Sequence, residues 1–327
     1  MEEPDSETSW WLCAYYAYLD SWKAADLADE DEATERAVGT LQDTVSGFLE
    51  HQHNFGTLKY RMDNASTESG SIFPLRSVSS ALSDLALGVP IDDLEPALRR
   101  ATSLPEGPGE AKGALMDLED FVESQVSRGN LERSQARPER WPELMAALWH
   151  IQEPTGWPLY SAPALNYLRK RGKVARMEPA HDYAEYAAFM RWLSEQTGAD
   201  MLSLEHMLSG LEEGEIEVPE SEECFRRSLE KARELEDEGM ADRAVAMYER
   251  ALSLRPRTPE ALRRKAAIYE GRGLIMAAIG EMEALVEIEP RDLPAHRKLI
   301  VLYKGQKMVR EHNIEVRRFK SLMEKKD

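Results

Sequence analysis

Two short stretches of this chain carry the residue types of metal and catalytic sites. His51 and His53 are two residues apart, which on a helix puts them on different faces, so they could share a metal ion only on a strand or in a turn. Glu110-Ala111-Lys112 has the E-x-K spacing of many nucleases. That chemistry also needs a preceding acidic residue held on strands, so that two carboxylates bind Mg²⁺. Loop-forming residues come before it and helix-forming residues after it, so we predict no metal site.

The remaining candidates for catalysis are isolated histidines. His150 follows Trp149 in a helix-favouring run, and both a buried helical residue and a functional one fit that position. His181, before Asp182, is typical of the first turn of a helix. The short motifs that mark phosphate loops, nucleophile elbows, zinc proteases and dinucleotide sites are absent from the sequence. We predict a non-enzymatic protein without a cofactor; an enzyme of unrecognised type stays an alternative, because catalytic groups need only converge in space.

Two clusters of basic residues could contact phosphate. Arg133, Arg137 and Arg140 line a polar stretch, and a second cluster ends a predicted helix. Cations at a helix C-terminus favour the helix dipole, which is the structural interpretation. The functional interpretation is a local nucleic-acid site, with Trp157 and Tyr160 near enough to stack on a base or to be core residues. The second cluster consists of Arg169, Lys170, Arg171, Lys173 and Arg176.

The charge of the chain is large and unevenly spread. The 327 residues carry a formal net charge of −19 at pH 7, which argues against a surface that binds nucleic acid as a whole. Residues 1–50 hold 13 Asp/Glu and 2 Lys/Arg, whereas residues 292–327 hold 10 Lys/Arg and 5 Asp/Glu. A basic C-terminal region in an acidic protein predicts that attraction for an anionic partner is local.

Cysteine usage and hydropathy indicate the compartment. The two cysteines, Cys13 and Cys224, are distant in sequence and predict reduced, buried thiols. No apolar run approaches the length of a membrane span, so we expect no membrane partner. The first residues are acidic where a secretory signal is basic. These features together predict a cytoplasmic protein.

Apolar residues at helical spacing run along most of the chain, and alternating β-branched runs are nearly absent. We therefore predict an all-α protein: an α-helical domain over 1–215, subdivided near 56–72 and 104–110, and helical repeats over 216–327. Thr8 or Ser9 is expected to cap the first helix. Loops are expected at 56–70, 104–109, 127–140 and 212–222. Helices in the first domain are expected at 8–28, 32–53, 74–86, 91–102, 111–128, 142–152, 162–171, 181–197 and 202–211.

A 34-residue echo near the C-terminus is the strongest pattern in the sequence. Such a period in a helix-favouring segment predicts stacked helical hairpins. Helix pairs are expected at 225–238 with 241–254, 259–271 with 274–288, and 292–303 with 308–323. Glycine permits the left-handed turn inside a pair, and proline stops the second helix. The echo consists of Gly239, Ala244, Tyr248, Leu252 and Pro256, which recur as Gly273, Ala278, Met282, Val286 and Pro290.

Residues 221–323 resemble the tetratricopeptide repeat (TPR) family on this period and residue order. The third copy departs from the family, with Lys307 at the turn glycine and His312 at a small-residue position. The resemblance implies a non-enzymatic adaptor, in which the first helix of each hairpin lines a groove for a protein partner. Five cations are expected to face that groove, with Glu236 and Glu270 among them. These cations are Arg226, Arg233, Arg263, Arg297 and Lys304.

A mostly basic groove favours an acidic peptide or segment, or a C-terminal carboxylate. Two alternatives stay open at this point. The cations could simply form a solvated helix face. With so few repeats, the array could instead dock on the N-terminal part of its own chain.

Residues 74–210 resemble a helical domain of bacterial modification-dependent restriction ATPases and related defence proteins. The resemblance rests on residues such as Pro154, Trp157, Tyr160 and Tyr186, but the run Glu205-His206-Met207-Leu208-Ser209 lacks the Leu-Trp pair of those relatives. It implies a place in antiviral defence or in a DNA-associated complex. The sequence thus predicts, first, a protein-protein adaptor and, as the alternative, a nucleic-acid-binding subunit.

Overall fold

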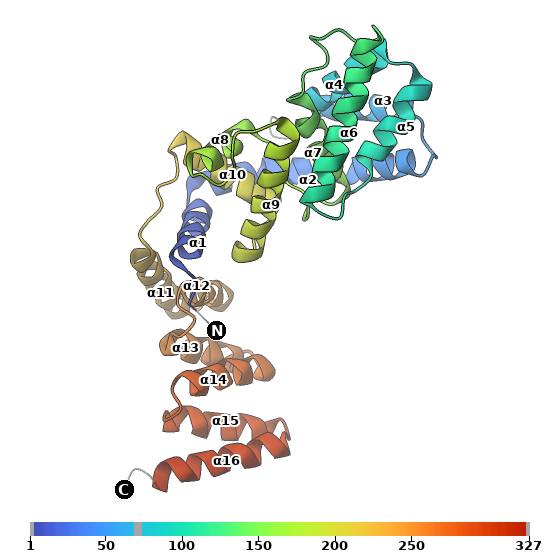
Figure 1. Ribbon diagram of the computed structural model, residues 1–327. Coiled ribbons are helices and arrows are strands. Elements are labelled where there is room, and N and C mark those ends of the chain that lie inside the picture. Colours follow the sequence, from blue (N-terminus) through green and yellow to red (C-terminus); the bar gives the residue numbers. More distant parts are fainter. Residues whose placement is uncertain (1–2, 69–73, 325–327) are drawn as a thin grey trace. The chain divides into compact units, whose positions relative to one another are not determined.

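The computed structural model of the protein describes residues 3–68 and 74–324 (Figure 1). Within these ranges it contains sixteen α-helices and no strand, so the predicted all-α class is confirmed. The chain forms two compact units. The repeat unit comprises Met1–Tyr16 and Val218–Asp327, and the middle unit comprises Ala17–Glu217. This division falls close to the expected boundary at 215–216 but differs from it at the N-terminus, because the first sixteen residues belong with the repeats.

The repeat unit is a series of three helical hairpins preceded by the start of α1 (Ser6–Leu19). In each hairpin two consecutive helices pack on one another, and neighbouring hairpins stack in chain order (Figure 1). The helices of the hairpins are α11 (Ser221–Asp237), α12 (Ala241–Leu254), α13 (Pro259–Gly271), α14 (Ile275–Ile288), α15 (Leu293–Gly305) and α16 (Val309–Glu324).

The turn inside each hairpin has one geometry, repeated every 34 residues. Gly239, Gly273 and Lys307 have φ angles of 77°, 75° and 58°, all in the left-handed region. In each turn the amide after the left-handed residue donates to the helix carbonyl five residues earlier, at 2.8, 2.8 and 2.9 Å. This is the bond that closes a helix end around a left-handed residue. The third copy therefore keeps the turn although it lacks the glycine.

Small residues sit where the helices of a hairpin meet, as the sequence predicts. Ala232 and Ala244 are 0% exposed in the first hairpin, and Ala278 is 0% exposed in the second. Larger side chains fill the spaces beside them, and Tyr248 is fully buried. Close approach of helix backbones requires small side chains at the crossing, so these alanines fix the hairpin geometry.

The middle unit surrounds α7 (Arg140–Gln152), whose residues 144–151 are all buried. A helix that is apolar on every side needs neighbours on every side. Five other helices of the unit contact it: α2, α4, α5, α6 and α9. The other helices of the unit are α2 (Trp22–Leu49), α3 (Phe55–Glu68), α4 (Leu75–Gly88), α5 (Ile91–Thr102), α6 (Pro108–Ser127), α8 (Ala162–Lys170), α9 (Pro179–Thr197) and α10 (Met201–Glu213).

Two local expectations were wrong. The predicted loop at 56–70 is helix α3 over most of its length. Its apolar residues Phe55, Leu58 and Met62 are buried at helical spacing, and the Asn54 side chain caps it by accepting from the Thr57 amide at 2.9 Å. The polar composition of this segment belongs to the exposed face of the helix. Residues 69–70 of the expected loop lie outside the described residues.

The N-terminal helix boundaries also differ from the prediction. The first helix ends at Leu19, and α2 runs without interruption from Trp22 through the gap expected at 29–31. The cap of α1 is Asp5, whose carboxylate accepts from the Thr8 amide at 2.7 Å, and not Thr8 or Ser9. An aspartate earlier in the chain satisfies the amide that the two hydroxyl residues were expected to satisfy.

Candidate functional site

The five predicted groove cations lie on the first helices of the three hairpins, α11, α13 and α15. All five side chains are exposed. Arg263 and Arg297 are 34 residues apart and so occupy equivalent positions in neighbouring hairpins. On α15, Arg297, Val301 and Lys304 share one helix face, because residues at i, i+4 and i+7 lie above one another. The sequence register therefore leads to a surface that runs from hairpin to hairpin.

Two of these cations, both on α11, are held by carboxylates of the repeat unit itself. Arg226 bonds Glu230 one turn later, at 2.9 Å to each carboxylate oxygen. Arg233 makes two bonds to Glu260 of the next hairpin, at 2.8 and 2.6 Å. This forked pair lowers the pKa of Glu260 and raises that of Arg233. Both arginines thus connect parts of the array and are neutralised there.

Arg263 on α13 is also paired. Its guanidinium contacts Asp292 at 2.7 Å and Glu289 at 3.3 Å, both at the entry to the third hairpin. The Asp292 side chain is 9% exposed and also caps α15 by accepting from the Ala295 amide at 3.0 Å. Arg263 therefore stabilises the junction between hairpins, which sequence register alone could not reveal.

The surface of α15 is different. Among the described residues no carboxylate lies within ion-pair distance of Arg297 or Lys304. Arg297 lies 5.9 Å from the centre of the Phe319 ring, a loose cation–π contact. Val301, between the two cations on the same face, is 59% exposed. The last hairpin thus presents two cations around an exposed apolar side chain.

Ion pairs between hairpins repeat with the sequence period. Arg264 on α13 pairs with Glu236 on α11 at 3.3 Å, and one period later Lys298 on α15 pairs with Glu270 on α13. A hydrogen-bond pair follows the same rule: the Tyr269 hydroxyl donates to Glu249, and the equivalent tyrosine of the third hairpin donates to its equivalent glutamate. Sequence reasoning missed these contacts, although a search for charge pairs shifted by 34 residues would have found them.

The first hairpin is partly covered by α1. Leu12, Cys13 and Tyr16 lie in one buried cluster with Cys224 and Leu254 of the hairpin. The Tyr16 hydroxyl is 2.6 Å from the Ser253 hydroxyl of α12, and Arg250 lies 5.0 Å from the Tyr16 ring centre. The alternative that the array docks on the N-terminal part of its own chain is thus realised for the first hairpin.

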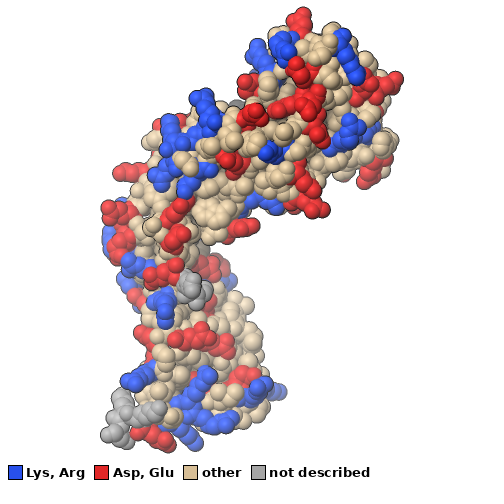
Figure 2. Space-filling view, viewed as in Figure 1, with Lys and Arg blue, Asp and Glu red and all other residues tan. Residues whose placement is uncertain are grey.

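The second predicted cluster of cations borders a hollow in the middle unit. The hollow has a volume of about 650 Å³ and lies at the C-terminal end of α8. Arg169, Lys170 and Arg176 line it together with the buried Val174 and the carboxylate of Glu212. Lys and Arg side chains gather over α8 on the face shown in Figure 2. Arg171 and Lys173, the other predicted members, are near in sequence but are not part of its lining.

Two of the three lining cations already have carboxylate partners. Arg169 pairs with Asp182, whose side chain is 5% exposed and also accepts from the Met177 amide at 2.7 Å. Lys170 pairs with Glu212 at 2.6 Å. Arg169 therefore has a structural role in holding the segment after α8, and the unneutralised charge near the hollow is smaller than the sequence indicates.

The other arginine cluster is divided among separate partners. Arg133 makes a forked pair with Glu123, and Arg140 pairs with Asp84 at 2.5 Å. Arg137 donates from Nε to the carbonyl of Ser134 at 3.2 Å. These three side chains stabilise the stretch between α6 and α7 and form no common surface for phosphate.

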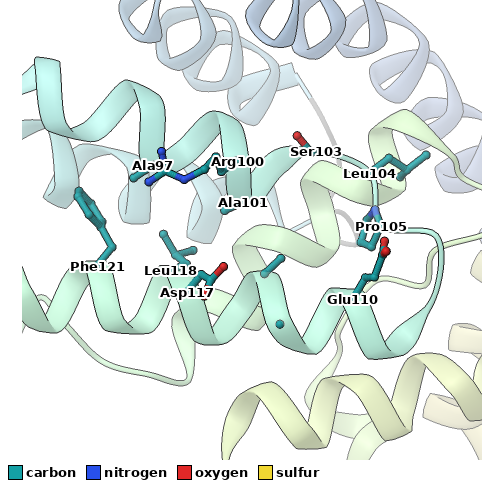
Figure 3. A pocket seen from close by; sticks show the side chains of 12 residues that line it. Ala97, Arg100, Ala101, Ser103, Leu104, Pro105, Glu110, Asp117, Leu118 and Phe121 are labelled. Atoms are coloured by element: carbon teal, nitrogen blue, oxygen red, sulfur yellow. The ribbon is translucent and has the colours of Figure 1, made fainter.

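The E-x-K fragment lies in the first turn of α6, beside a hollow of about 380 Å³ between α5 and α6 (Figure 3). Glu110 lines this hollow with Asp117 and Arg100, and its carboxylate accepts from the Glu106 amide at 2.8 Å. The Lys112 amine contacts the His181 ring at 2.5 Å. Because the fragment is helical, its carboxylate has no strand partner, and the nuclease arrangement is not formed.

The histidine candidates are separate from one another. His51 has a φ of 61° in the turn after α2, and the carbonyl of His53 accepts from Arg99 at 3.0 Å. His150 is 1% exposed in the core of the middle unit; its Nδ1 donates to the Trp157 carbonyl at 2.7 Å, and burial lowers its pKa. Over the described ranges, no three His, Cys, Asp or Glu side chains are grouped to hold a metal ion.

A buried glutamate in the middle unit is the strongest electrostatic feature that sequence reasoning missed. Glu205 on α10 accepts from the Ser161 hydroxyl at 2.5 Å and from the Tyr186 hydroxyl. Burial raises its pKa to about 7, against an ordinary value of 4.5. Ser161 precedes α8 and Tyr186 lies on α9, so the carboxyl connects three segments. Its position in a Leu- and Met-rich helix, where a charge is unexpected, was the available signal.

None of the described helices combines the length and the apolar character that crossing a bilayer requires. No protein-family model matches the chain, and a comparison with curated proteins found no match.

Proposed function

We propose that the protein is a non-enzymatic adaptor whose TPR-like repeat unit binds an acidic segment of a protein partner. The carrying observation is the exposed face of α15, where Arg297 and Lys304 flank Val301 and have no carboxylate partner among the described residues. Cations around an apolar side chain fit a peptide with acidic residues and one apolar anchor.

The environment of this face supports the choice of the third hairpin. The equivalent cations of the first two hairpins are occupied by Glu230, Glu260 and Asp292, and part of the first hairpin is covered by α1. The net charge of residues 292–327 is +5, from 10 Lys/Arg less 5 Asp/Glu. An anionic partner is therefore attracted to this end of an otherwise acidic protein. The resemblance of residues 74–210 to defence-associated domains favours a partner in antiviral defence or in a DNA-associated complex.

Binding of labelled peptides by the full chain tests the proposal. Peptides that combine glutamates with one leucine are expected to bind with an affinity that falls as salt rises, and matched lysine peptides are not. The double variant Arg297→Glu with Lys304→Glu should abolish binding. The control Arg310→Glu with Lys320→Glu changes the net charge equally on α16 and should retain it. Equal loss in both variants, or no preference for acidic peptides, would refute the proposal.

The hollow beside α8 supports a second candidate function, binding of nucleic-acid phosphates by the middle unit. Arg176 and Lys170 border it, and Lys173 follows in the same segment. Changing Lys170, Lys173 and Arg176 together to Ala should then remove a salt-sensitive gel shift. Arg169 is left in place, because its removal would strand the buried Asp182 carboxylate. An unchanged shift in the triple variant rejects this candidate.

A further inference from the structure

The two cysteines of the chain, distant in sequence, meet inside the repeat unit. Cys13 on α1 and Cys224 on α11 lie in the same buried cluster, where they are 1% and 5% exposed. Neither is in a disulfide. The two thiols are hydrogen-bonded to one another. Because the sequence contains no other cysteine, any thiol chemistry of this protein belongs to this pair.

The helices on both sides of the pair are fixed by further contacts. One turn after Cys13, the Tyr16 hydroxyl lies 2.6 Å from the Ser253 hydroxyl, and Arg250 lies over the Tyr16 ring. Cys224 is in the first turn of α11, and its amide donates to the Glu220 carbonyl at 2.9 Å. The meeting of the thiols therefore depends on the docking of α1 against the first hairpin and not on a mobile side chain.

We propose that Cys13 and Cys224 form a redox-active dithiol, which a low-molecular-weight disulfide such as oxidised glutathione converts to an intramolecular disulfide that pins residues 6–16 to the first hairpin. A buried pair in contact offers each thiol the other as the nearest reaction partner. A bond there converts a non-covalent contact of α1 into a covalent one. The proposal is independent of the α15 surface.

The exchange balances in two steps. The thiol of Cys224, the more exposed of the two, loses its proton, and the thiolate attacks one sulfur of the small disulfide. The S–S bond of that molecule breaks and its first thiolate leaves. The Cys13 thiolate then attacks the Cys224 sulfur, the mixed S–S bond breaks, and the second small thiolate leaves. Two protein thiols are oxidised and one small disulfide is reduced to two thiols, which take up the two protons.

The immediate surroundings suit Cys13 to the second step. The hydrogen bond from the Cys224 thiol lowers the pKa of Cys13, against the opposing effect of burial, and Ser221 adds a smaller effect in the same direction as the hydrogen bond. A thiol with a lowered pKa supplies more thiolate at neutral pH. In the reduced protein α1 stays docked by apolar contacts alone, so reduction restores its freedom to leave the hairpin.

The test uses the full reduced chain, exposed to oxidised glutathione without denaturant. We expect both thiols to disappear together, an intact mass lower by two hydrogens, and one cross-linked peptide that joins the Cys13 and Cys224 segments in a monomer. Dithiothreitol should restore both thiols. Cys13→Ala and Cys224→Ala should give no cross-link and at most one bound glutathione.

Proteolysis provides the second measurement. Cleavage within residues 6–16 should be slower in the oxidised protein than in the reduced one, and the two alanine variants should show no such difference. Two thiols that stay unmodified in the wild type overturn the proposal. Glutathione bound stably on both cysteines, disulfide-linked dimers as the main product, or a cross-link that leaves cleavage unchanged would each overturn it as well.

Discussion

The repeat unit and the middle unit place their charges in opposite ways. In the repeat unit, charged side chains lie on exposed helix faces and pair across hairpins at a fixed interval, as Arg264 with Glu236 and Lys298 with Glu270. In the middle unit, a carboxyl group lies in the core, where Glu205 accepts hydroxyl hydrogen bonds from Ser161 and Tyr186. One unit repeats a weak contact several times, and the other depends on single contacts that are used once.

This difference determines how each unit should respond to substitution. A repeated array distributes its stability over similar interfaces, so one exposed contact contributes little. A core built around one helix concentrates stability in a few large side chains, because a cavity there has no equivalent elsewhere to share its cost. The largest effects are therefore expected in the middle unit and the smallest at the periodic ion pairs.

The sharpest test of this contrast is Trp149→Ala in the middle unit. Trp149 is fully buried, its ring centre lies 5.4 Å from that of Trp157 and 5.7 Å from that of Tyr183, and its Nε1 donates to the Ala101 carbonyl at 3.2 Å. We expect the free energy of unfolding to fall by about 3–5 kcal/mol in urea denaturation. The exposed Tyr60→Ala should cost less than about 0.5 kcal/mol. Comparable losses in the two variants would remove the contrast.

Glu205 gives the middle unit a pH dependence that the repeat unit lacks at this site. Its folded pKa of about 7 exceeds the ordinary 4.5, so between these values the folded state holds a proton that the unfolded state has lost. Stability from this group is complete below about pH 4.5 and is lost as the pH rises to about 7, a fall of about 3 kcal/mol. The neighbouring His206 lowers the pKa and Tyr186 and Ser161 hydrogen-bond the charged form, but burial prevails.

Urea denaturation from pH 4.5 to 8 checks this expectation. Glu205→Gln keeps the shape and the acceptor oxygen and removes the titration, so the difference in stability between variant and wild type should grow in favour of the variant as the pH rises. The exposed Glu195→Gln on α9 is the control and should follow the wild type at every pH. A pH-independent difference for Glu205→Gln would mean that the carboxyl titrates normally.

The repeat unit could be predicted from sequence because its information is periodic. Gly239, Gly273, Pro256 and Pro290 mark each boundary, and a 34-residue shift is sufficient to place every hairpin. The partners of Arg233 and Arg263 were missed because the period describes which residues are equivalent and not which residues of neighbouring hairpins touch. Pairing depends on side-chain reach across the interface.

The middle unit could be predicted only as a set of helices. Its helix α3 was missed because polar residues outnumber the three apolar residues that bury it, and composition outweighed spacing. The convergence of Ser161, Tyr186 and Glu205 is a product of tertiary packing, as is the meeting of Cys13 with Cys224. No local pattern encodes which distant segments lie together, so these sites required coordinates.

The hairpin turns provide an effect of intermediate size. Gly273 has a φ of 75°, and an added Cβ would meet no atom within 4 Å, so the cost of Gly273→Ala is the left-handed backbone itself, about 1 kcal/mol. Lys307 has a φ of 58° at the equivalent turn, and Lys307→Gly should stabilise by up to about 1 kcal/mol. Thermal unfolding of both variants measures the pair.

Gly271→Ala is the matched control for these turns. Gly271 ends α13 two residues before Gly273, has no positive φ, and also leaves space for a Cβ. Alanine there should stabilise by about 0.5 kcal/mol, because it lowers the entropy of the unfolded chain. If Gly273→Ala behaved like Gly271→Ala, the left-handed turn would not be what the repeats have in common.

The smallest expected effects are at the periodic ion pairs. Arg264 and Lys298 have side chains 46% and 42% exposed, and exposed pairs contribute about 0.2–1 kcal/mol. Double-mutant cycles of Arg264→Ala with Glu236→Gln and of Lys298→Ala with Glu270→Gln should give coupling energies that agree within about 0.5 kcal/mol and vanish near 1 M salt. The glutamine keeps an acceptor for the Tyr248 hydroxyl, which donates to Glu236 at 2.9 Å. Couplings of opposite sign would show that equivalent positions do not make equivalent contacts, and the repeat unit would then depend on individual contacts as the middle unit does.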